Sequence, residues 1–325
     1  MIKTVNISHL INKGHMSKLL PIISASLVAF SVYANAQSID NVEYKVQTQV
    51  RFDDRSNRDS RIQYRVRAYA SYHFLDTNWS LNAFAVTGDE FSSSYNTLDS
   101  DVADHFHLRR LYGRYTGEDG TKTEIGVIPT YKGRVSSSGL AKDGWIKGVR
   151  QVYGYSADTK FEVVVGELED DEAKTSLDKF KKLNYVELEI SSNIDQSSSY
   201  EFSVERMTGE NFARGEYRIF LKDAPIFSFE VINRLSTSKT KVVVGVEDSI
   251  DVFNNTIDYY AYYSFVSDNF GSRAELTEDF ITTGHGLSIE ADTRIFDSKK
   301  WKAFARFDLF DQNSRFILGI GYTIE

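Results

Sequence analysis

The chain has 325 residues, of which 41% are hydrophobic and 14% aromatic, and it contains no Cys. The absence of Cys excludes disulfides, thiolate metal sites and cysteine nucleophiles. The formal net charge is -8, and the acidic excess lies in residues 161–325, which hold 30 acidic and 18 basic residues. Nucleic acid binding requires a basic footprint, so no nucleic acid partner is expected.

The first 36 residues predict a secretory signal peptide. Lys18 precedes the apolar run LLPIISASLVAFSV, which is too short to span a bilayer as a helix. Ala34-Asn35-Ala36 then provides a small-x-small cleavage site. We therefore predict cleavage after Ala36 and export from the cytoplasm.

Two methionines could start this leader. Met16 begins a compact signal peptide, whereas Met1 adds a polar extension before it, so Met16 is the expected start. The leader 1–36 holds three basic and no acidic residues, so the mature chain 37–325 is predicted to carry a net charge of -11.

The mature chain opens with long alternating runs. In RIQYRVRAYASYHF, residues 61–74, one set of alternate residues is apolar or aromatic and the other includes Arg61, Arg65 and Arg67. Such alternation predicts a β-strand with side-chain period two. Fourteen residues is more than twice the usual strand of about five or six, and a tilted strand crosses a bilayer with about 9–11 residues. One face is expected to meet lipid and the other water.

The same pattern recurs along the chain and predicts sixteen strands. In chain order they span residues 42–52, 61–74, 78–87, 105–116, 121–128, 145–156, 160–167, 183–191, 199–209, 215–223, 226–236, 239–248, 256–266, 283–296, 299–311 and 314–324. Connections after the second, fourth, sixth, tenth and fourteenth strands are short, and those after the third, fifth, seventh and thirteenth are long. Outer-membrane barrels have an even strand count, short periplasmic turns and long outer loops. The connections after the eleventh, twelfth and fifteenth strands depart from this rule, which leaves fourteen strands as an alternative.

We therefore predict an all-β protein: one transmembrane antiparallel up-and-down β-barrel over residues 37–325, in contact with outer-membrane lipid. A soluble exported β-sandwich would also alternate, but its strands should be shorter.

One strand breaks its own alternation at Leu108-Arg109-Arg110-Leu111. A β-bulge there would aim Arg109 and Arg110 inward together. Without it, one arginine would face lipid at a cost of roughly 2–4 kcal/mol near the bilayer centre. We predict the bulge.

The inward-facing charges predict two walls of a pore. The basic wall comprises Arg61, Arg65, Arg67, Arg109, Arg110 and Arg114. The acidic wall comprises Glu187, Glu189, Glu201 and Glu205, several strands away. Opposed charges across a water-filled pore would orient and filter polar solutes. The alternative is that these residues are only the solvated faces of strands.

The leader, strand count, alternation of short and long connections, and closing strand resemble those of Gram-negative outer-membrane porins. The resemblance implies passive diffusion of small hydrophilic solutes or ions across the outer membrane, and a homotrimer, as in many porins. In many porins the loop after the fifth strand folds into the channel. Residues 129–144 occupy that place, which implies that Arg134, Lys142 and Asp143 are constriction residues.

The closing strand carries a further part of the resemblance. Phe316, Leu318, Ile320, Tyr322 and Ile324 alternate as the terminal signal read by the barrel assembly machinery does. That signal normally ends in an aromatic residue, whereas this chain ends in Ile324-Glu325.

No enzyme motif stands out in the sequence. His105 and His107 share a strand face, but no third metal ligand lies near them. Neither GxSxG, HExxH, Walker nor dinucleotide motifs occur. We predict no enzymatic activity, cofactor or metal site. A substrate-specific channel or an enzyme on the same barrel remains the alternative.

Overall fold

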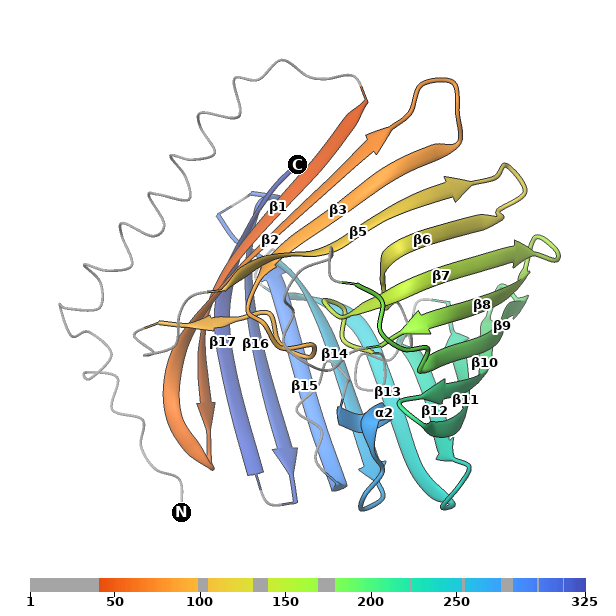
Figure 1. Cartoon of the computed structure of the whole chain (residues 1–325). Helices are drawn as coiled ribbons and strands as arrows, with labels where there is room; N and C mark the ends of the chain where they lie inside the picture. Colours follow the sequence, from red (N-terminus) through yellow and green to blue (C-terminus); the bar gives the residue numbers. More distant parts are fainter. Residues whose placement is uncertain are drawn as a thin grey trace. The chain divides into compact units, whose positions relative to one another are not determined.

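The computed structural model is a closed antiparallel β-barrel (Figure 1). The structure describes residues 41–98, 105–130, 140–168, 179–222, 224–252, 255–275, 283–296, 298–311 and 313–325. The predicted signal peptide and its cleavage site lie outside these residues.

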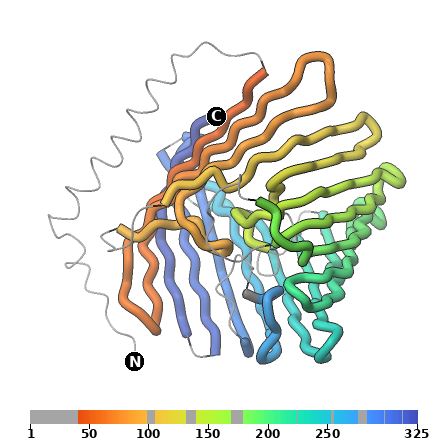
Figure 2. Tube along the Cα trace, in the orientation of Figure 1, coloured from red at the N-terminus to blue at the C-terminus, as the bar shows by residue number. Residues whose placement is uncertain are grey.

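Sixteen long strands form the wall. They are β1 (Val42–Arg55), β2 (Arg58–His73), β3 (Trp79–Thr87), β5 (Phe106–Thr116), β6 (Lys122–Pro129), β7 (Trp145–Gly154), β8 (Thr159–Glu167), β9 (Tyr185–Asp195), β10 (Ser198–Met207), β11 (Glu210–Phe220), β12 (Ile226–Arg234), β13 (Lys239–Val252), β14 (Asn255–Val266), β15 (Gly284–Arg294), β16 (Trp301–Phe310) and β17 (Asn313–Ile324). Each pairs with its neighbour in sequence, and β1 pairs with both β2 and β17, which closes the barrel (Figure 2). The prediction of sixteen strands is confirmed, and the alternative of fourteen is wrong.

Several strand boundaries differ from the prediction, and β9 and β13 each continue four residues beyond their predicted ends, to Asp195 and Val252. The expected connector at residues 53–60 is largely strand, because β1 runs to Arg55 and β2 begins at Arg58. Its charged side chains are accommodated because Asp53 pairs with the surrounding arginines. The strand expected from residue 215 begins at Glu210. The short strand β4 (Asn96–Thr97), which pairs with β2, was not predicted.

The longest connections share one rim. They span residues 88–105, 130–144, 168–184 and 267–283, and each leaves the end of the barrel at which the β1–β2 turn also lies. The connections at the other rim are short turns. This asymmetry matches the short inner turns and long outer loops of outer-membrane barrels.

The predicted bulge in β5 is confirmed. Phe84 pairs with Arg110 while Ala85 pairs with Leu108, so Arg109 is the additional residue. Both arginine side chains are buried rather than exposed on the outer face. The bulge thus keeps both cations off the surface that would meet lipid.

Exposed apolar side chains alternate with buried polar ones along the strands. On β16, Phe307 and Leu309 are exposed while Asp308 is fully buried. On β10, Phe202 and Val204 are exposed while Glu205 is buried. A wall that is apolar outside and polar inside is typical of a barrel whose solvent is lipid.

Aromatic side chains gather near the rim of short turns. The ring pairs there are Tyr72 with Phe74, Trp79 with Tyr115, Tyr155 with Phe161, and Trp301 with Tyr322. Such girdles mark the level of the lipid headgroups in membrane barrels.

Several long connections turn inward. Phe91, Leu140, Leu168 and Phe270 from these connections are buried in one apolar cluster with inward side chains of the wall, including Phe212. The connection after β14 contains the one-turn helix α2 (Ser272–Glu275). In the part of the chain that the structure describes, no helix is long and apolar enough to cross a membrane.

Candidate functional site

A cavity of about 1270 Å³ opens inside the barrel. Its walls come from β1 and β2, from β12 to β17, and from residues 89, 90, 92–97, 105 and 141–143 of the long connections. Most of its lining side chains are charged or polar. Water and small polar solutes are therefore the natural contents of this space.

Arginines dominate one side of the cavity. Arg51, Arg55, Arg58, Arg61, Arg65 and Arg67 on β1 and β2, together with Arg315 on β17, line it. Most reach it because alternate residues of these strands face inward, whereas Arg58 reaches it from the first residue of β2. Arg61, Arg65 and Arg67 belong to the predicted basic wall, whereas Arg51, Arg55, Arg58 and Arg315 were not predicted, although the same alternation rule would have found Arg51.

Four of these arginines surround one carboxylate. Asp53 accepts hydrogen bonds from Arg61 Nε at 3.0 Å and Arg315 Nε at 2.8 Å. Arg55 Nε and Arg58 Nη2 each lie 3.3 Å from the same carboxylate. The Asp53 side chain is itself fully buried. We call Asp53, Arg55, Arg58, Arg61 and Arg315 the Asp53 cluster.

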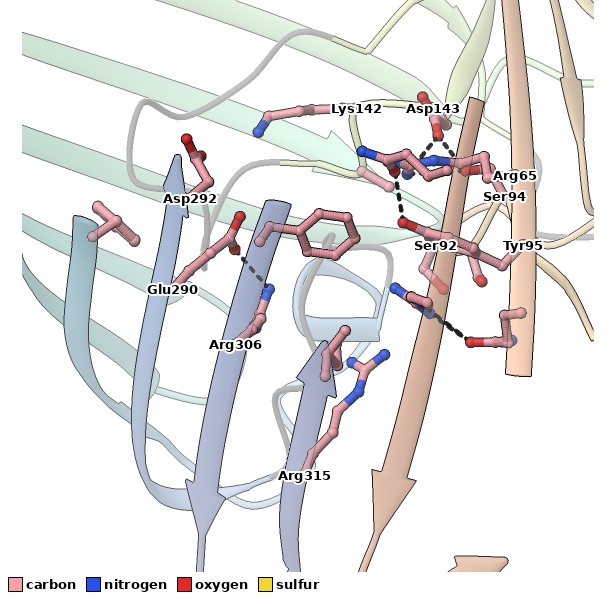
Figure 3. Close-up of a pocket in the computed structure, with 18 of the residues that line it drawn as sticks. Arg65, Ser92, Ser94, Tyr95, Lys142, Asp143, Glu290, Asp292, Arg306 and Arg315 are labelled. Atoms are coloured by element: carbon pink, nitrogen blue, oxygen red, sulfur yellow. Dashed lines mark hydrogen bonds and ion pairs between the residues drawn. The ribbon is translucent and has the colours of Figure 1, made fainter. Parts of the chain in front are cut away.

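The segment before β7 folds against the arginine side of the cavity. Arg67 donates two hydrogen bonds to Asp143 Oδ2, at 2.9 and 2.7 Å, and the Ser94 hydroxyl donates to the same oxygen. Arg65 Nη1 lies 3.6 Å from that oxygen. Lys142 and Asp143 both line the cavity, and Figure 3 shows them beside Arg65 and Ser94. The third predicted constriction residue, Arg134, lies outside the described residues.

The two arginines of the bulge hold the same segment by its backbone. Arg109 donates to Asp143 O at 3.3 Å and to Gly88 O at 2.7 Å. Arg110 donates to Gly144 O at 2.7 Å and also to Lys142 O. Neither arginine lines the cavity. Instead of forming its surface, both fix the segment that does.

The sixth residue of the predicted basic wall points elsewhere. Arg114 donates to Glu124 Oε1 at 2.8 Å, and Glu124 also accepts from the buried Arg150 at 2.7 Å. This ion-pair network joins β5, β6 and β7, and Arg114 is not among the residues that line the cavity.

The predicted acidic wall lies apart from this cavity. None of its four glutamates is a lining residue. Glu187 accepts from Tyr185 OH at 2.6 Å, and Glu205 accepts from Arg273 Nε at 3.0 Å. Arg273 belongs to α2, so a long connection reaches Glu205 from inside the barrel.

A single buried arginine gathers the remaining glutamates. Arg214 on β11 lies 3.0 Å from Glu201 and 3.8 Å from Glu189. It also pairs with Glu216 and Glu230. We call Arg214 with these four glutamates the Arg214 cluster, and its arginine is fully buried.

The acids that line the cavity come from other strands. They are Glu247 and Asp248 on β13, Asp258 on β14, Glu290 and Asp292 on β15, and Asp89, Glu90 and Asp143 on the connections. In Figure 3, Glu290 and Asp292 lie across the cavity from Arg65 and Tyr95. Lys302 lies 2.5 Å from Asp292, and Arg306 Nη1 lies 3.6 Å from Glu290. The acidic side is therefore partly neutralised by cations of β16.

The titration of Asp143 gives a testable consequence. Burial alone would raise the pKa of this carboxyl group, but the Arg67 and Arg65 guanidiniums and the Ser94 hydroxyl outweigh burial and hold the pKa well below its usual range. A carboxylate whose pKa is depressed by folding stabilises the folded state fully at pH values above its unfolded pKa of about 4. That stabilisation is lost as the pH falls through the lower folded pKa.

We therefore expect Asp143→Asn to lower the free energy of unfolding by about 3 kcal/mol at neutral pH, since it leaves two largely buried arginines without their carboxylate. The difference from wild type should stay constant down to about pH 5 and shrink below about pH 4. SDS gels of samples heated at each pH across this range compare the stability of the variant with that of wild type. The exposed Glu118→Gln variant is the control. A difference that grows on acidification would contradict the ion pair.

The two predicted rim histidines stack on one another. The rings of His105 and His107 lie 5.5 Å apart, and His105 Nε2 lies 3.4 Å from Asp89. Among the described residues, no group of three or more His, Asp or Glu side chains is placed to hold a metal ion.

Comparison with known proteins shows similarity in fold alone. No family model and no curated protein sequence matches the chain. Solved structures of mutants of the Rh. blastica porin do match. One mutant with two alanine substitutions has a TM-score of 0.61 and 11% identity, and another with four has a TM-score of 0.62 and 11% identity. Both matches cover 87% of this chain and 100% of the porin. At this level of identity the likeness establishes architecture, and it agrees with the strand order and rim asymmetry described above: the chain has the sixteen-stranded barrel fold of the bacterial porins.

Proposed function

We propose that the mature chain is an outer-membrane porin through which small hydrophilic solutes and ions diffuse passively. The observation that carries this proposal is the charged cavity of about 1270 Å³ inside a closed barrel. An apolar outer face and an aromatic girdle support placement in a membrane.

The proposed diffusion path runs on one side of the barrel. It passes between the arginines of β1 and β2 and the acids of β13 to β15. The inward connection that carries Phe270 and Arg273 occupies the side next to β10 and β11, where Phe270 packs on Phe212 and Arg273 pairs with Glu205. We propose that Lys142 and Asp143 narrow this path. Arg134 belongs to the same proposal through its place in the sequence.

We further propose that the leader is cleaved after Ala36 and that the closing strand is read by the barrel assembly machinery. Homotrimer formation is part of the proposal. A patch of small outward side chains on β2 and β3, where Ala68 pairs with Ala85 and Ala70 with Ala83, offers a flat surface for close contact. Cross-linking of the purified protein in detergent tests the trimer, and a monomer alone would contradict it.

We expect the purified mature chain to produce stepwise ion conductance in planar lipid bilayers. It should also migrate differently in SDS gels before and after boiling, because a closed barrel resists SDS until heated. Conductance without any added substrate separates passive diffusion from a substrate-gated channel. A barrel that shifts on boiling but never conducts at high protein load would contradict the porin, and extraction from membranes by salt alone would contradict the membrane barrel.

A further inference from the structure

The Asp53 cluster has more positive than negative charge. Four guanidiniums share the one carboxylate of Asp53, and all four arginines line the cavity. A fifth arginine, Arg51, lies beside them on β1, where it donates to Gln63 Oε1 and stacks 3.5 Å from the Tyr95 ring centroid.

Four other acids of the cavity pair with cations outside the cluster. Asp143 pairs with Arg65 and Arg67, and Glu247 pairs with Arg218. Glu290 and Asp292 pair with Arg306 and Lys302.

Two further acids on the β1–β2 hairpin do not line the cavity. They are Asp54, which accepts from the Ser60 hydroxyl, and Asp59. The remaining acids that line the cavity are Asp89, Glu90, Asp248 and Asp258. Within the cluster itself, four guanidiniums lie around one carboxylate.

We propose that the Asp53 cluster binds the phosphate group of a small anionic solute inside the lumen. The proposal rests on the proposed function, since the solute enters through the water-filled path. Arg58 and Arg61 are the arginines of the cluster that remain most exposed, with 37% and 27% of their side-chain surface accessible. They are the groups that an entering anion meets.

Phosphate fits this cluster better than a carboxylate does. Guanidinium forks bind phosphate oxygens through paired, charge-assisted hydrogen bonds. A phosphate monoester carries nearly two negative charges at neutral pH and three acceptor oxygens. It can therefore balance more of the excess charge than a carboxylate, which carries one.

The position of the cluster suggests a staging site. Arg61, Arg65 and Arg67 follow one another along the inner face of β2, and Asp143 lies at Arg65 and Arg67. At about 3.3 Å per residue, Arg61 and Arg65 are roughly 13 Å apart along the strand. An anion held at the Asp53 cluster thus lies one step before the segment that narrows the path.

The test is titration of the full-length mature barrel in detergent with inorganic phosphate, by calorimetry in a phosphate-free buffer. Arg58→Gln/Arg61→Gln should weaken phosphate binding about tenfold or more, because it removes two charged donors. The matched control is Lys302→Gln/Arg306→Gln, which removes two cations from the same cavity but outside the cluster. The single variant Arg58→Gln, at the most exposed position, should also weaken phosphate binding, but by a smaller factor than the double variant. Migration on unheated gels reports folding of each variant.

Equal weakening in both double variants would overturn the site in favour of a diffuse field, and undiminished binding in the cluster variants would overturn it outright. Acetate binding as tight as phosphate would overturn the phosphate assignment.

Chloride conductance of the same samples is measured separately. A barrel that binds phosphate through the cluster yet never conducts would contradict the porin but not the site, and a conducting barrel without phosphate binding would contradict only the site.

Discussion

We expect the Arg65→Gln/Arg67→Gln variant to shift the reversal potential of the channel toward cation preference. Two unit charges about 7 Å from the path change the electrostatic energy of a passing monovalent ion by roughly 1 kcal/mol in water before screening. Salt at about 0.1 M has a Debye length of about 10 Å, which roughly halves that contribution. The ratio of anion to cation permeability should therefore fall by a factor of about three or more. Planar bilayers under a potassium chloride gradient measure the shift.

Two further variants sharpen this test. Asp143→Asn removes the carboxylate that both arginines share and should move the reversal potential in the opposite direction. Arg114→Gln removes a cation that pairs with Glu124 and does not line the cavity, so it should leave the potential nearly unchanged. Shifts of the same sign for the Arg65/Arg67 and Asp143 variants, or a large shift for Arg114→Gln, would place the conducting path elsewhere.

The largest loss of stability is expected from Arg214→Met. This fully buried guanidinium is the shared partner of four glutamates from four strands. Removing one partner of a buried ion pair costs about 3–5 kcal/mol, because the remaining charge is left uncompensated. Urea unfolding of the barrel in lipid vesicles measures the change in free energy.

The matched control for Arg214→Met is Arg206→Met, an exposed arginine on the neighbouring strand β10. This substitution should change the free energy of unfolding by no more than about 0.5 kcal/mol, as most surface substitutions do. Arg214→Lys keeps the charge but loses the planar guanidinium fork, so its loss of stability should lie between those of Arg206→Met and Arg214→Met. Equal stability of Arg214→Met and Arg206→Met would mean that the glutamates find other compensation.

The strand pattern of this chain was readable because side-chain period two is a local property. Where one face of a strand meets lipid and the other meets the lumen, each second residue must be apolar. That rule located all sixteen long strands and also the bulge at Arg109, where two consecutive arginines had to face inward. It was less accurate at residues 53–60, where charge alone suggested a connector.

The composition of the walls was less predictable, because it depends on contacts between distant segments. Alternation correctly turned Glu187 and Glu205 inward, but it could not reveal that Arg273 of α2 would pair with Glu205. The same rule applied to β15 would have identified Glu290 and Asp292, which do line the cavity. The pore-lining roles of Arg61, Arg65 and Arg67, like the constriction at Lys142 and Asp143, stay predictions until conductance is measured.

The sequence by itself determined the closed antiparallel barrel and the asymmetry of its rims and favoured sixteen strands over fourteen, since each follows from local alternation and loop length. Only the tertiary structure decided which partner each inward charge meets. Arg109 and Arg110 bond to backbone carbonyls, Arg114 pairs with Glu124, and Glu205 of the predicted acidic wall pairs with Arg273 of an inward connection. Asp53 became the centre of a basic cluster because closure brings β17 beside β1, across 262 residues of sequence. Ion pairing across a closed sheet depends on such long-range proximity, which no local pattern encodes.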